Sequence, residues 1–381
     1  MPFKSASKII ALNLLVLGLF LIIPGFAFGI YKHIKLSLAE KEETESNKTH
    51  PAYITDEERN IAEAMGSEKQ SGVQFRSFLG WKRQPFTAKY QNVLDNGYNT
   101  RLSTNTALNN SVWFFGGSII WGTGSPDSQT IPSYYAQRTG SNVLNLGETA
   151  WVSRQSLNQF IDLLGDGYRP KKVIFYEGTN DILHGCRVEL KNVPSHSREG
   201  EIDKALSKDG EWRALSKFNK SAINFIISPY KAVAAKLGFN VSKHQSYGAL
   251  DCSTNPEKAD KIASHLVNNW YTAYNLSKAF GAEFIGILNP NSFVSSQSTE
   301  YVHTGDSYVE PEIKSVYPII RDKMNESCKV DLDFCQQLVD GSSWLDNSKR
   351  AVYLDFSHLN SAGNKIIADK IVDLNESTGN Q

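Results

Sequence analysis

The chain has 381 residues, of which 40% are hydrophobic and 21% charged, a composition typical of a globular protein with a substantial core. Lysine and arginine together number 40, as do aspartate and glutamate, and this balance argues against a protein that binds nucleic acid by neutralising phosphates. We therefore expect no nucleic-acid partner.

The N-terminus carries an uncharged, apolar run over residues 9–30, preceded by Lys4 and Lys8. Because about 20 such residues cross a bilayer, the run predicts a transmembrane helix. A cleaved signal peptide is the alternative, since Pro24 interrupts the run and residues 27–29 resemble a cleavage site. In both cases we expect the rest of the chain to be exported.

The next part of the chain, residues 36–110, is predicted to be a polar linker followed by an irregular lead-in to the main domain. One short helix is expected near residues 55–65, because Thr55 and Asp56 can cap it and acidic residues follow in its first turn. The aromatic residues after it are scattered between turn residues, which favours irregular structure.

From residue 111 onward, short apolar strands alternate with amphipathic helices. The expected strands are 112–115, 143–146, 173–176, 283–288 and 351–354, and the expected helices are 131–138, 153–164, 258–280, 312–325 and 361–374. Such alternation predicts an α/β fold with a mostly parallel sheet covered on both faces.

The domain organisation follows from these patterns. We predict an anchor or signal over residues 1–35 and an α/β domain over residues 111–376. Residues 186–257 interrupt the alternation and are predicted to be an insertion. Its helical stretches near 202–214 and 221–237 contain an apolar group over residues 223–233 that could line a lid or the buried face of a helix.

The chain has four cysteines, at positions 186, 252, 328 and 335. Because no two of them form a Cys-x-x-Cys pair, zinc binding and thioredoxin-like chemistry are not indicated. Pairing Cys328 with Cys335 would close a small loop, and pairing Cys186 with Cys252 would close the insertion. Four free thiols remain the alternative.

Four of the expected strands are each followed by a glycine or polar motif. The motifs are Gly116-Gly117-Ser118, Asn145-Leu146-Gly147-Glu148, Glu177-Gly178-Thr179-Asn180-Asp181 and Asp355-Phe356-Ser357-His358-Leu359-Asn360. Active sites of open parallel sheets lie at the carboxyl ends of the strands, so these motifs are expected to meet in one place.

These four blocks, in this order, resemble the SGNH (GDSL-like) hydrolases, named after their serine, glycine, asparagine and histidine. The resemblance implies a three-layer α/β/α domain with a five-stranded, flavodoxin-like sheet. It also implies hydrolysis of esters by a serine nucleophile, with no metal and no organic cofactor.

The chemistry of such a site assigns a role to each motif. Ser118 is expected to be the nucleophile, activated by His358, whose imidazole Asp355 orients. The backbone amides of Ser118 and Gly147 and the side-chain amide of Asn180 are expected to form the oxyanion hole, which stabilises the negative oxygen of the tetrahedral intermediate.

A second Asp-x-x-His pair, Asp181 with His184, also occurs. We prefer Asp355 and His358, because they lie between the last expected strand and the last helix. Three further residues are candidates for substrate binding: Trp121, Glu148 and Asp181. For Trp121 the alternative is packing in the core, and for Glu148 the alternative is a structural or solvent-facing role.

The sequence therefore predicts a single-pass membrane protein, or a secreted one after signal cleavage, whose exported domain hydrolyses carboxylic esters. The expected partners are an ester-bearing small molecule or an acylated glycan, with O-acetyl as the favoured group, and the membrane itself. An O-acyltransferase that uses the same triad, a lipase or phospholipase, and a non-catalytic glycan-binding protein are the alternatives.

Overall fold

The computed structural model describes residues 50–68, 72–190, 247–296 and 306–378, together with six single residues at positions 23, 30, 31, 196, 198 and 302. One compact unit comprises Asn47–Ser197 and Gln245–Gln381. The other comprises Met1–Ser46 and Arg198–His244, and the description covers only positions 23, 30, 31 and 198 of it.

Within these described ranges, no helix is both long enough and apolar enough to cross a membrane. Apart from Ile23 and Ile30, the predicted span over residues 9–30 lies outside them. The predicted helical stretches and apolar group of the insertion also lie outside them.

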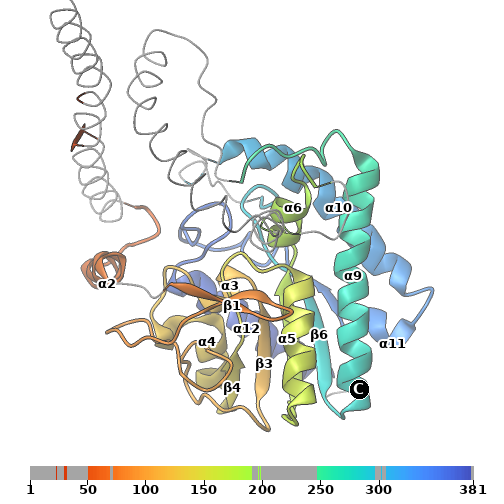
Figure 1. Cartoon of the computed structure of the whole chain (residues 1–381), viewed down its shortest axis with the longest axis horizontal. Coiled ribbons are helices and arrows are strands. Elements are labelled where there is room, and N and C mark those ends of the chain that lie inside the picture. The colour runs from red at the N-terminus through yellow and green to blue at the C-terminus, as the bar shows by residue number, and fades with distance from the viewer. Residues whose placement is uncertain are drawn as a thin grey trace, which may run out of the picture. The chain divides into compact units, whose positions relative to one another are not determined.

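The described elements follow in the order helix, hairpin, then alternating strands and helices (Figure 1). They are α2 (Asp56–Ser67), β1 (Val73–Arg76), β2 (Gly80–Arg83), β3 (Val112–Gly116), α3 (Ser118–Trp121), η1 (Asp127–Gln129), α4 (Ile131–Thr139), β4 (Val143–Asn145), α5 (Ser153–Gly165), β5 (Lys172–Glu177), α6 (Thr179–Gly185), α9 (Pro256–Ala279), β6 (Glu283–Leu288), η3 (Ser307–Val309), α10 (Glu310–Ser327), α11 (Leu332–Cys335), β7 (Leu338–Asp340) and α12 (Ser361–Thr378).

The central sheet has five strands in the order β4-β3-β5-β6-β7, and every pair is parallel. This is the strand order 2-1-3-4-5 of a flavodoxin-like, doubly wound sheet. The predicted three-layer α/β fold with a five-stranded sheet is therefore confirmed.

The identity of the fifth strand was predicted wrongly. Residues 351–354 lie outside the sheet, where Tyr353 forms an isolated antiparallel bridge with Leu359. The edge strand is instead β7, which pairs Asp340 with Leu288. A short apolar run indicates that a segment is buried, but it does not show that the segment is a strand. Val352 and Tyr353 are fully buried. By contrast, β7 is only partly buried, so it has no strong apolar pattern.

Two hydrophobic cores cover the two faces of the sheet. Along β3, Trp113 and Phe115 belong to the core that also holds residues of α5, α9 and α10. Val112 and Phe114 belong to the other core, with residues of α4 and α12. The alternation follows from the two-residue period of a strand. Figure 1 shows α5 and α9 running alongside the strands.

The lead-in before the sheet is more ordered than the sequence indicated. Helix α2 begins at Asp56 as expected, and Thr55 and Glu58 form a reciprocal capping box at its N-terminus. Strands β1 and β2 form an antiparallel hairpin. Further on, Arg101 forms a bridge with Asn145 at the end of β4, which ties the lead-in to the sheet.

Both cysteine pairings that the sequence suggested are present: Cys186 with Cys252, and Cys328 with Cys335. The first disulfide joins residues 66 positions apart at the base of the insertion. Next to it, Arg187 forms an isolated antiparallel bridge with Leu250.

Candidate active site

Ser118 lies where β3 ends and is the first residue of the short helix α3. The turn before it needs glycine, because a Cβ atom at Gly117 would lie 2.2 Å from Nδ2 of Asn180. Gly122, in the left-handed conformation with φ 89°, ends the helix and donates its N–H to the carbonyl of Ser118. The local sequence thus places the serine hydroxyl on a tight turn at the carboxyl edge of the sheet.

Ser118, His358 and Asp355 form one continuous chain of hydrogen bonds. Nε2 of His358 lies 2.8 Å from Oγ of Ser118, although the residues are 240 positions apart, and Nδ1 lies 2.5 Å from Oδ2 of Asp355. The other carboxylate oxygen, Oδ1, accepts the backbone N–H groups of Ser357 and His358, each at 2.8 Å. This geometry fits an imidazole that donates from Nδ1 and accepts the serine proton at Nε2.

Asp355 and His358 shift one another's pKa values. Burial alone would raise the pKa of Asp355, but the charge and hydrogen bonds of His358 hold it well below its ordinary value. Burial alone would lower the pKa of His358, but the Asp355 carboxylate raises it above 6.5. Asp355 therefore stays ionised at neutral pH, and His358 gains basicity.

The structure brings two of the three predicted oxyanion donors to the serine. The N–H of Ser118 begins α3 and so has no acceptor within that helix. The side-chain amide of Asn180 packs against Gly117 and donates one N–H to the carbonyl of Trp151 at 2.8 Å. A primary amide has two N–H donors, so a second remains for a substrate oxygen.

Gly147 is placed differently. Its backbone N–H donates to Oδ1 of Asn145 at 3.1 Å, so this donor is already engaged. A Cβ atom at Gly147 would lie 2.3 Å from the backbone nitrogen of Trp121. The structure thus shows Gly147 as the position that lets β4 pack closely against α3.

A small pocket opens beside Ser118. Gly117, Ser118, Ile119, Trp151, Tyr176, Glu177, Gly178, Thr179, Asn180, Asp181, Asn289 and Ser357 line it. Its cavity volume is about 20 Å³. Of the three substrate-binding candidates, Asp181 lines this pocket, whereas Trp121 and Glu148 do not.

Trp121 and Glu148 are buried against arginines of the lead-in. The guanidinium groups of Arg83 and Arg101 each lie 4.2 Å from the ring centroid of Trp121. Oε2 of Glu148 accepts the backbone N–H of Arg83 at 2.8 Å, and this side chain is fully buried. Both contacts give these residues a packing role.

Two acidic side chains of the third motif are bound by neighbouring helices. Asp181 accepts the N–H and hydroxyl of Ser153 at 3.1 and 2.6 Å, so it caps α5 from outside the helix. Glu177 accepts the indole N–H of Trp270 at 2.9 Å. Burial raises the pKa of both carboxyl groups, and the charge of Asp181 raises that of Glu177 further.

The competing Asp-x-x-His pair is not assembled in the way that Asp355 and His358 are. Asp181 is bound to Ser153, and the ring of His184 stacks on His196 with centroids 4.2 Å apart. His196 in turn lies within hydrogen-bonding distance of the Ala150 carbonyl, at 2.9 Å.

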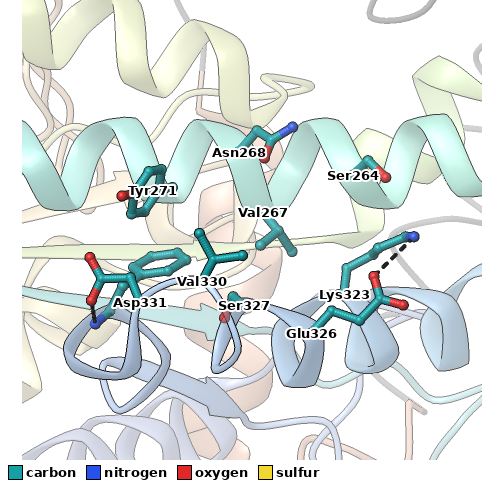
Figure 2. Close-up of a pocket in the computed structure, with 10 residues that line it drawn as sticks. Ser264, Val267, Asn268, Tyr271, Lys323, Glu326, Ser327, Val330 and Asp331 are labelled. Atoms are coloured by element: carbon teal, nitrogen blue, oxygen red, sulfur yellow. Dashed lines mark hydrogen bonds and ion pairs between the residues drawn. The ribbon is translucent and has the colours of Figure 1, made fainter.

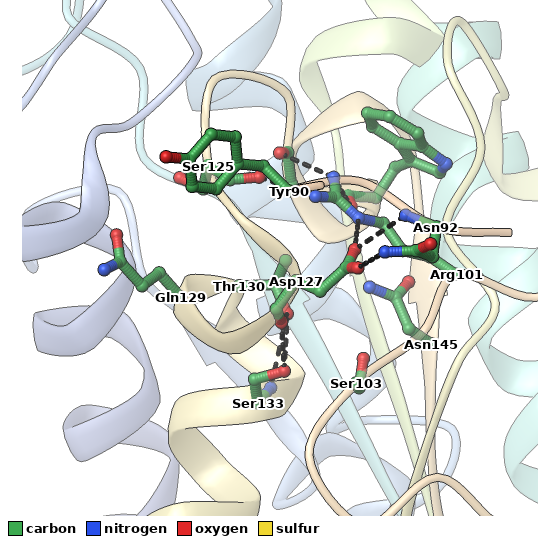
Figure 3. A network of polar contacts seen from close by, with 12 residues as sticks. Tyr90, Asn92, Arg101, Ser103, Ser125, Asp127, Gln129, Thr130, Ser133 and Asn145 are labelled. Carbon is green, nitrogen blue, oxygen red and sulfur yellow. Dashed lines mark hydrogen bonds and ion pairs between the residues drawn. The ribbon is translucent and has the colours of Figure 1, made fainter. Parts of the chain in front are cut away.

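Arg101 holds the far end of the nucleophile's helix. This fully buried side chain donates to the carbonyls of Trp121 and Gly122, both at 2.8 Å, and Nε lies 2.9 Å from Oδ1 of Asp127. Figure 3 shows Arg101, Asp127 and Asn92 converging from the lead-in and the segment after α3. The last turn of α3 therefore depends on residues that come before the sheet.

Sequence reasoning missed the polar loop after β6. Asn289 accepts the backbone N–H of Thr179 at 3.1 Å and donates to its hydroxyl at 2.9 Å. Ser292 donates its N–H to the carbonyl of Phe356 at 2.9 Å. The loop thus connects the Asn180 motif to the His358 motif. The signal was present, because Asn289 and Asn291 directly follow the fourth strand at the same sheet edge.

A larger groove of about 260 Å³ lies elsewhere, between α9 and the segment formed by α10 and α11 (Figure 2). Tyr271 and Phe334 contribute aromatic rings to it, and Lys323 pairs with Glu326 of the same helix at its rim. It contains no member of the Ser118 hydrogen-bond chain.

Among the described residues, one group has side-chain atoms close enough together to bind a metal ion: Cys186, Cys252 and Glu312. The two cysteines are joined in a disulfide, so they do not offer thiolate ligands.

The profile of the GDSL-like lipase/acylhydrolase family matches residues 112–371, which is more than half of the chain. No curated protein sequence matches this chain.

Three similar solved structures come from bacteria. A member of the lipolytic G-D-S-L family from Veillonella parvula is 13% identical, with 69% of this chain and 96% of that one covered and a TM-score of 0.37. A carbohydrate acetylesterase from Sinorhizobium meliloti is 14% identical, with 70% and 100% covered and a TM-score of 0.35. An acetylxylan esterase from Geobacillus stearothermophilus, a catalytic mutant, is 11% identical, with 72% and 94% covered and a TM-score of 0.35.

The family match spans the sheet, the serine turn and the Asp355–His358 loop, and such domains hydrolyse esters. The chain belongs to the GDSL-like lipase/acylhydrolase family.

Proposed function

We propose that this protein is an exported, membrane-tethered serine esterase that removes small acyl groups, such as O-acetyl, from a glycan. The observation that carries the proposal is the unbroken hydrogen-bond chain from Ser118 through His358 to Asp355. It is the arrangement that a serine needs to become a nucleophile, because a hydroxyl is unreactive until a base removes its proton.

The proposed reaction has two halves. Oγ of Ser118 attacks the ester carbonyl carbon while Nε2 of His358 takes the hydroxyl proton. The negative oxygen that forms is stabilised by the N–H of Ser118 and the free N–H of Asn180. His358 then gives its proton to the departing sugar oxygen, which leaves as the alcohol.

In the second half, a water molecule loses a proton to His358 and attacks the acyl-enzyme. The second tetrahedral intermediate releases the carboxylic acid as Ser118 regains its proton from His358. If a sugar hydroxyl replaces the water, the same acyl-enzyme yields an O-acyltransferase, so the acceptor alone separates these two activities.

The size of the pocket supports a short acyl group. The cavity beside Ser118 has a volume of about 20 Å³, against about 260 Å³ for the groove between α9 and α10. Asp181, Asn289 and Thr179 give the pocket polar atoms, which suit a hydroxyl-rich alcohol better than a lipid.

Export and tethering are supported by the sequence and by the disulfides. The apolar run over residues 9–30 has the length of a membrane span. The pairing of all four cysteines is typical of proteins that fold in an oxidising compartment.

The proposal is tested with p-nitrophenyl esters of increasing chain length and with an O-acetylated polysaccharide, using the full-length chain in detergent. We expect the acetyl ester to be cleaved with the highest kcat/KM and the octanoyl ester at least about tenfold more slowly. Ser118→Ala is the control and should abolish cleavage.

An added deacetylated glycan identifies the acceptor in the same assay. Acetate release supports the esterase. Transfer of the acetyl group to the glycan would show the acyltransferase, and preference for long chains would show a lipase.

A further inference from the structure

The loop that carries Asp355 and His358 packs on the core but does not pair with any described strand of the sheet. We call residues 350–360 the triad loop. Inside it, Leu354 donates its N–H to the carbonyl of His358 at 2.8 Å, and Asn360 donates its N–H to that of Val352 at 2.9 Å. These bonds close the loop on itself but do not fix it relative to Ser118, which lies on a separate strand end.

Both ends of the triad loop are attached to a single atom of the lead-in. The carbonyl oxygen of Ala52 accepts Nη2 of Arg350 at 3.0 Å and Nδ2 of Asn360 at 2.5 Å. Arg350 precedes Asp355, and Asn360 follows His358. Ala52 is fully buried, so this shared acceptor is shielded from water.

An ion pair strengthens the same attachment. Nη2 of Arg350 lies 2.9 and 3.1 Å from the two carboxylate oxygens of Glu58. The side chains of Arg350 and Glu58 are only 29% and 25% exposed, so the pair is less screened than a surface pair.

Glu58 is itself held in place. Its carboxylate accepts the N–H groups of Ile54 and Thr55 at 2.7 and 3.1 Å. Burial would raise the pKa of Glu58, but these hydrogen bonds and Arg350 lower it overall. The carboxylate is therefore ionised at neutral pH.

A histidine of the same segment reaches the triad loop. Burial lowers the pKa of His50, while the backbone of Leu354 and the charge of Asp355 act to raise it, so the ring lies close to the triad loop. Its Nδ1 also accepts the N–H of Ala52 at 3.2 Å. His50 and Ala52 thus contact the triad loop on both sides of Tyr353.

We propose that residues 50–58 are a positioning segment for catalysis: they fix the triad loop so that His358 stays within hydrogen-bonding distance of Ser118, with Arg350 and Glu58 as the positioning pair. This inference rests on the proposed serine mechanism and adds a requirement to it. The hydrolase activity depends on residues that precede the α/β sheet and lie outside the family match at residues 112–371.

The test compares Arg350→Gln, Arg350→Lys and Glu58→Gln in the full-length chain with p-nitrophenyl acetate as substrate. Titration with a fluorophosphonate counts the reactive serines, so that kcat is expressed per reactive site. Because a misplacement of about 1 Å can cost on the order of a hundredfold in rate, we expect Arg350→Gln to lower this kcat by about tenfold to a hundredfold. KM should stay within about twofold, since neither residue lines the pocket.

Two comparisons separate positioning from simple stability. Arg350→Lys keeps a cation near Glu58 and should recover part of the loss, and Arg350→Gln combined with Glu58→Gln should be no worse than Arg350→Gln alone. Arg321→Gln is the matched control, because Arg321 pairs with Asp340 at 2.7 Å with similar exposures of 35% and 39%. It should change the melting temperature but not kcat per reactive site.

The inference is overturned if Arg350→Gln and Glu58→Gln lower the melting temperature or the fraction of reactive enzyme while kcat per reactive site equals that of the unmodified chain. Glu58→Gln retains a side-chain oxygen for Ile54 and Thr55 and so provides a folded variant if Arg350→Gln does not fold. Failure of the serine mechanism itself looks different, because Ser118→Ala would then keep its activity.

Discussion

At the scale of single residues, the reactivity of Ser118 depends on how two opposing effects balance at His358. Burial favours the neutral imidazole, and the Asp355 carboxylate favours the protonated one, with a net rise of the pKa above 6.5. His358 must be neutral to accept the serine proton. Activity should therefore be low in acid and rise with pH through a value above 6.5.

Replacing Asp355 by asparagine should move that transition. Asp355→Asn removes the charge that raises the pKa of His358, so the acidic limb of the kcat/KM profile should shift to lower pH. The maximal rate should fall by on the order of 10⁴-fold, because the amide N–H of asparagine can donate to Nδ1 and favour the wrong tautomer of the imidazole.

The kcat/KM profile is measured between about pH 4 and pH 9, which covers the ordinary pKa values of carboxyl and imidazole groups. Asp333→Asn serves as control, since this side chain is 76% exposed and lies in α11. An acidic limb that does not move in Asp355→Asn would remove the electrostatic role given to Asp355.

At the scale of elements, the helices and strands that could be predicted from the sequence are those with a strong local pattern. Helix α2 has a capping box, and β3 and β5 are apolar runs with glycine at their carboxyl ends, so their existence and type could be predicted. The short edge strand β7 could not, because its pairing with β6 involves three residues with little burial. Residues 351–354 looked like a strand because Val352 and Tyr353 are buried in the second core.

In the candidate site too, residues in local motifs could be predicted and contacts between distant segments could not. Motifs after the predicted strands identified the residues of the hydrogen-bond chain, although the Asp355–His358 motif follows a buried segment that lies outside the sheet. The cap that Asp181 provides for α5 and the attachment of the triad loop to Ala52 join segments 28 and 308 positions apart. No local pattern encodes such contacts.

The helix that begins with Ser118 should be sensitive to the loss of Arg101. Because Asp127 would be left without its buried cation, Arg101→Met should reduce the free energy of unfolding by about 3–5 kcal/mol. Urea denaturation at neutral pH measures this loss. Arg169→Met is a suitable control, because its guanidinium lies over the ring of Phe280, a side chain that is 41% exposed. Equal stability of Arg101→Met and Arg169→Met would contradict the structural role of Arg101.

At the scale of the whole molecule, the two disulfides close loops of very different length. Cys186 and Cys252 are 66 positions apart, and Cys328 and Cys335 are 7 apart. Loop-closure entropy predicts that replacing the first pair by serine costs about 4 kcal/mol and the second about 2 kcal/mol. Thermal unfolding of the two double variants, each against the unmodified chain, checks the order. A larger loss for the shorter loop would show that chain entropy does not dominate.

The central claim for the molecule is that Ser118 carries the acyl group during turnover. The most direct measurement mixes the full-length chain with p-nitrophenyl acetate, quenches the reaction in acid during the first turnover and maps the acetyl group by peptide mass. We predict one acetyl group on the peptide that contains Ser118 and none in Ser118→Ala. An acetyl group on another residue, or unchanged p-nitrophenol release by Ser118→Ala, would contradict the account.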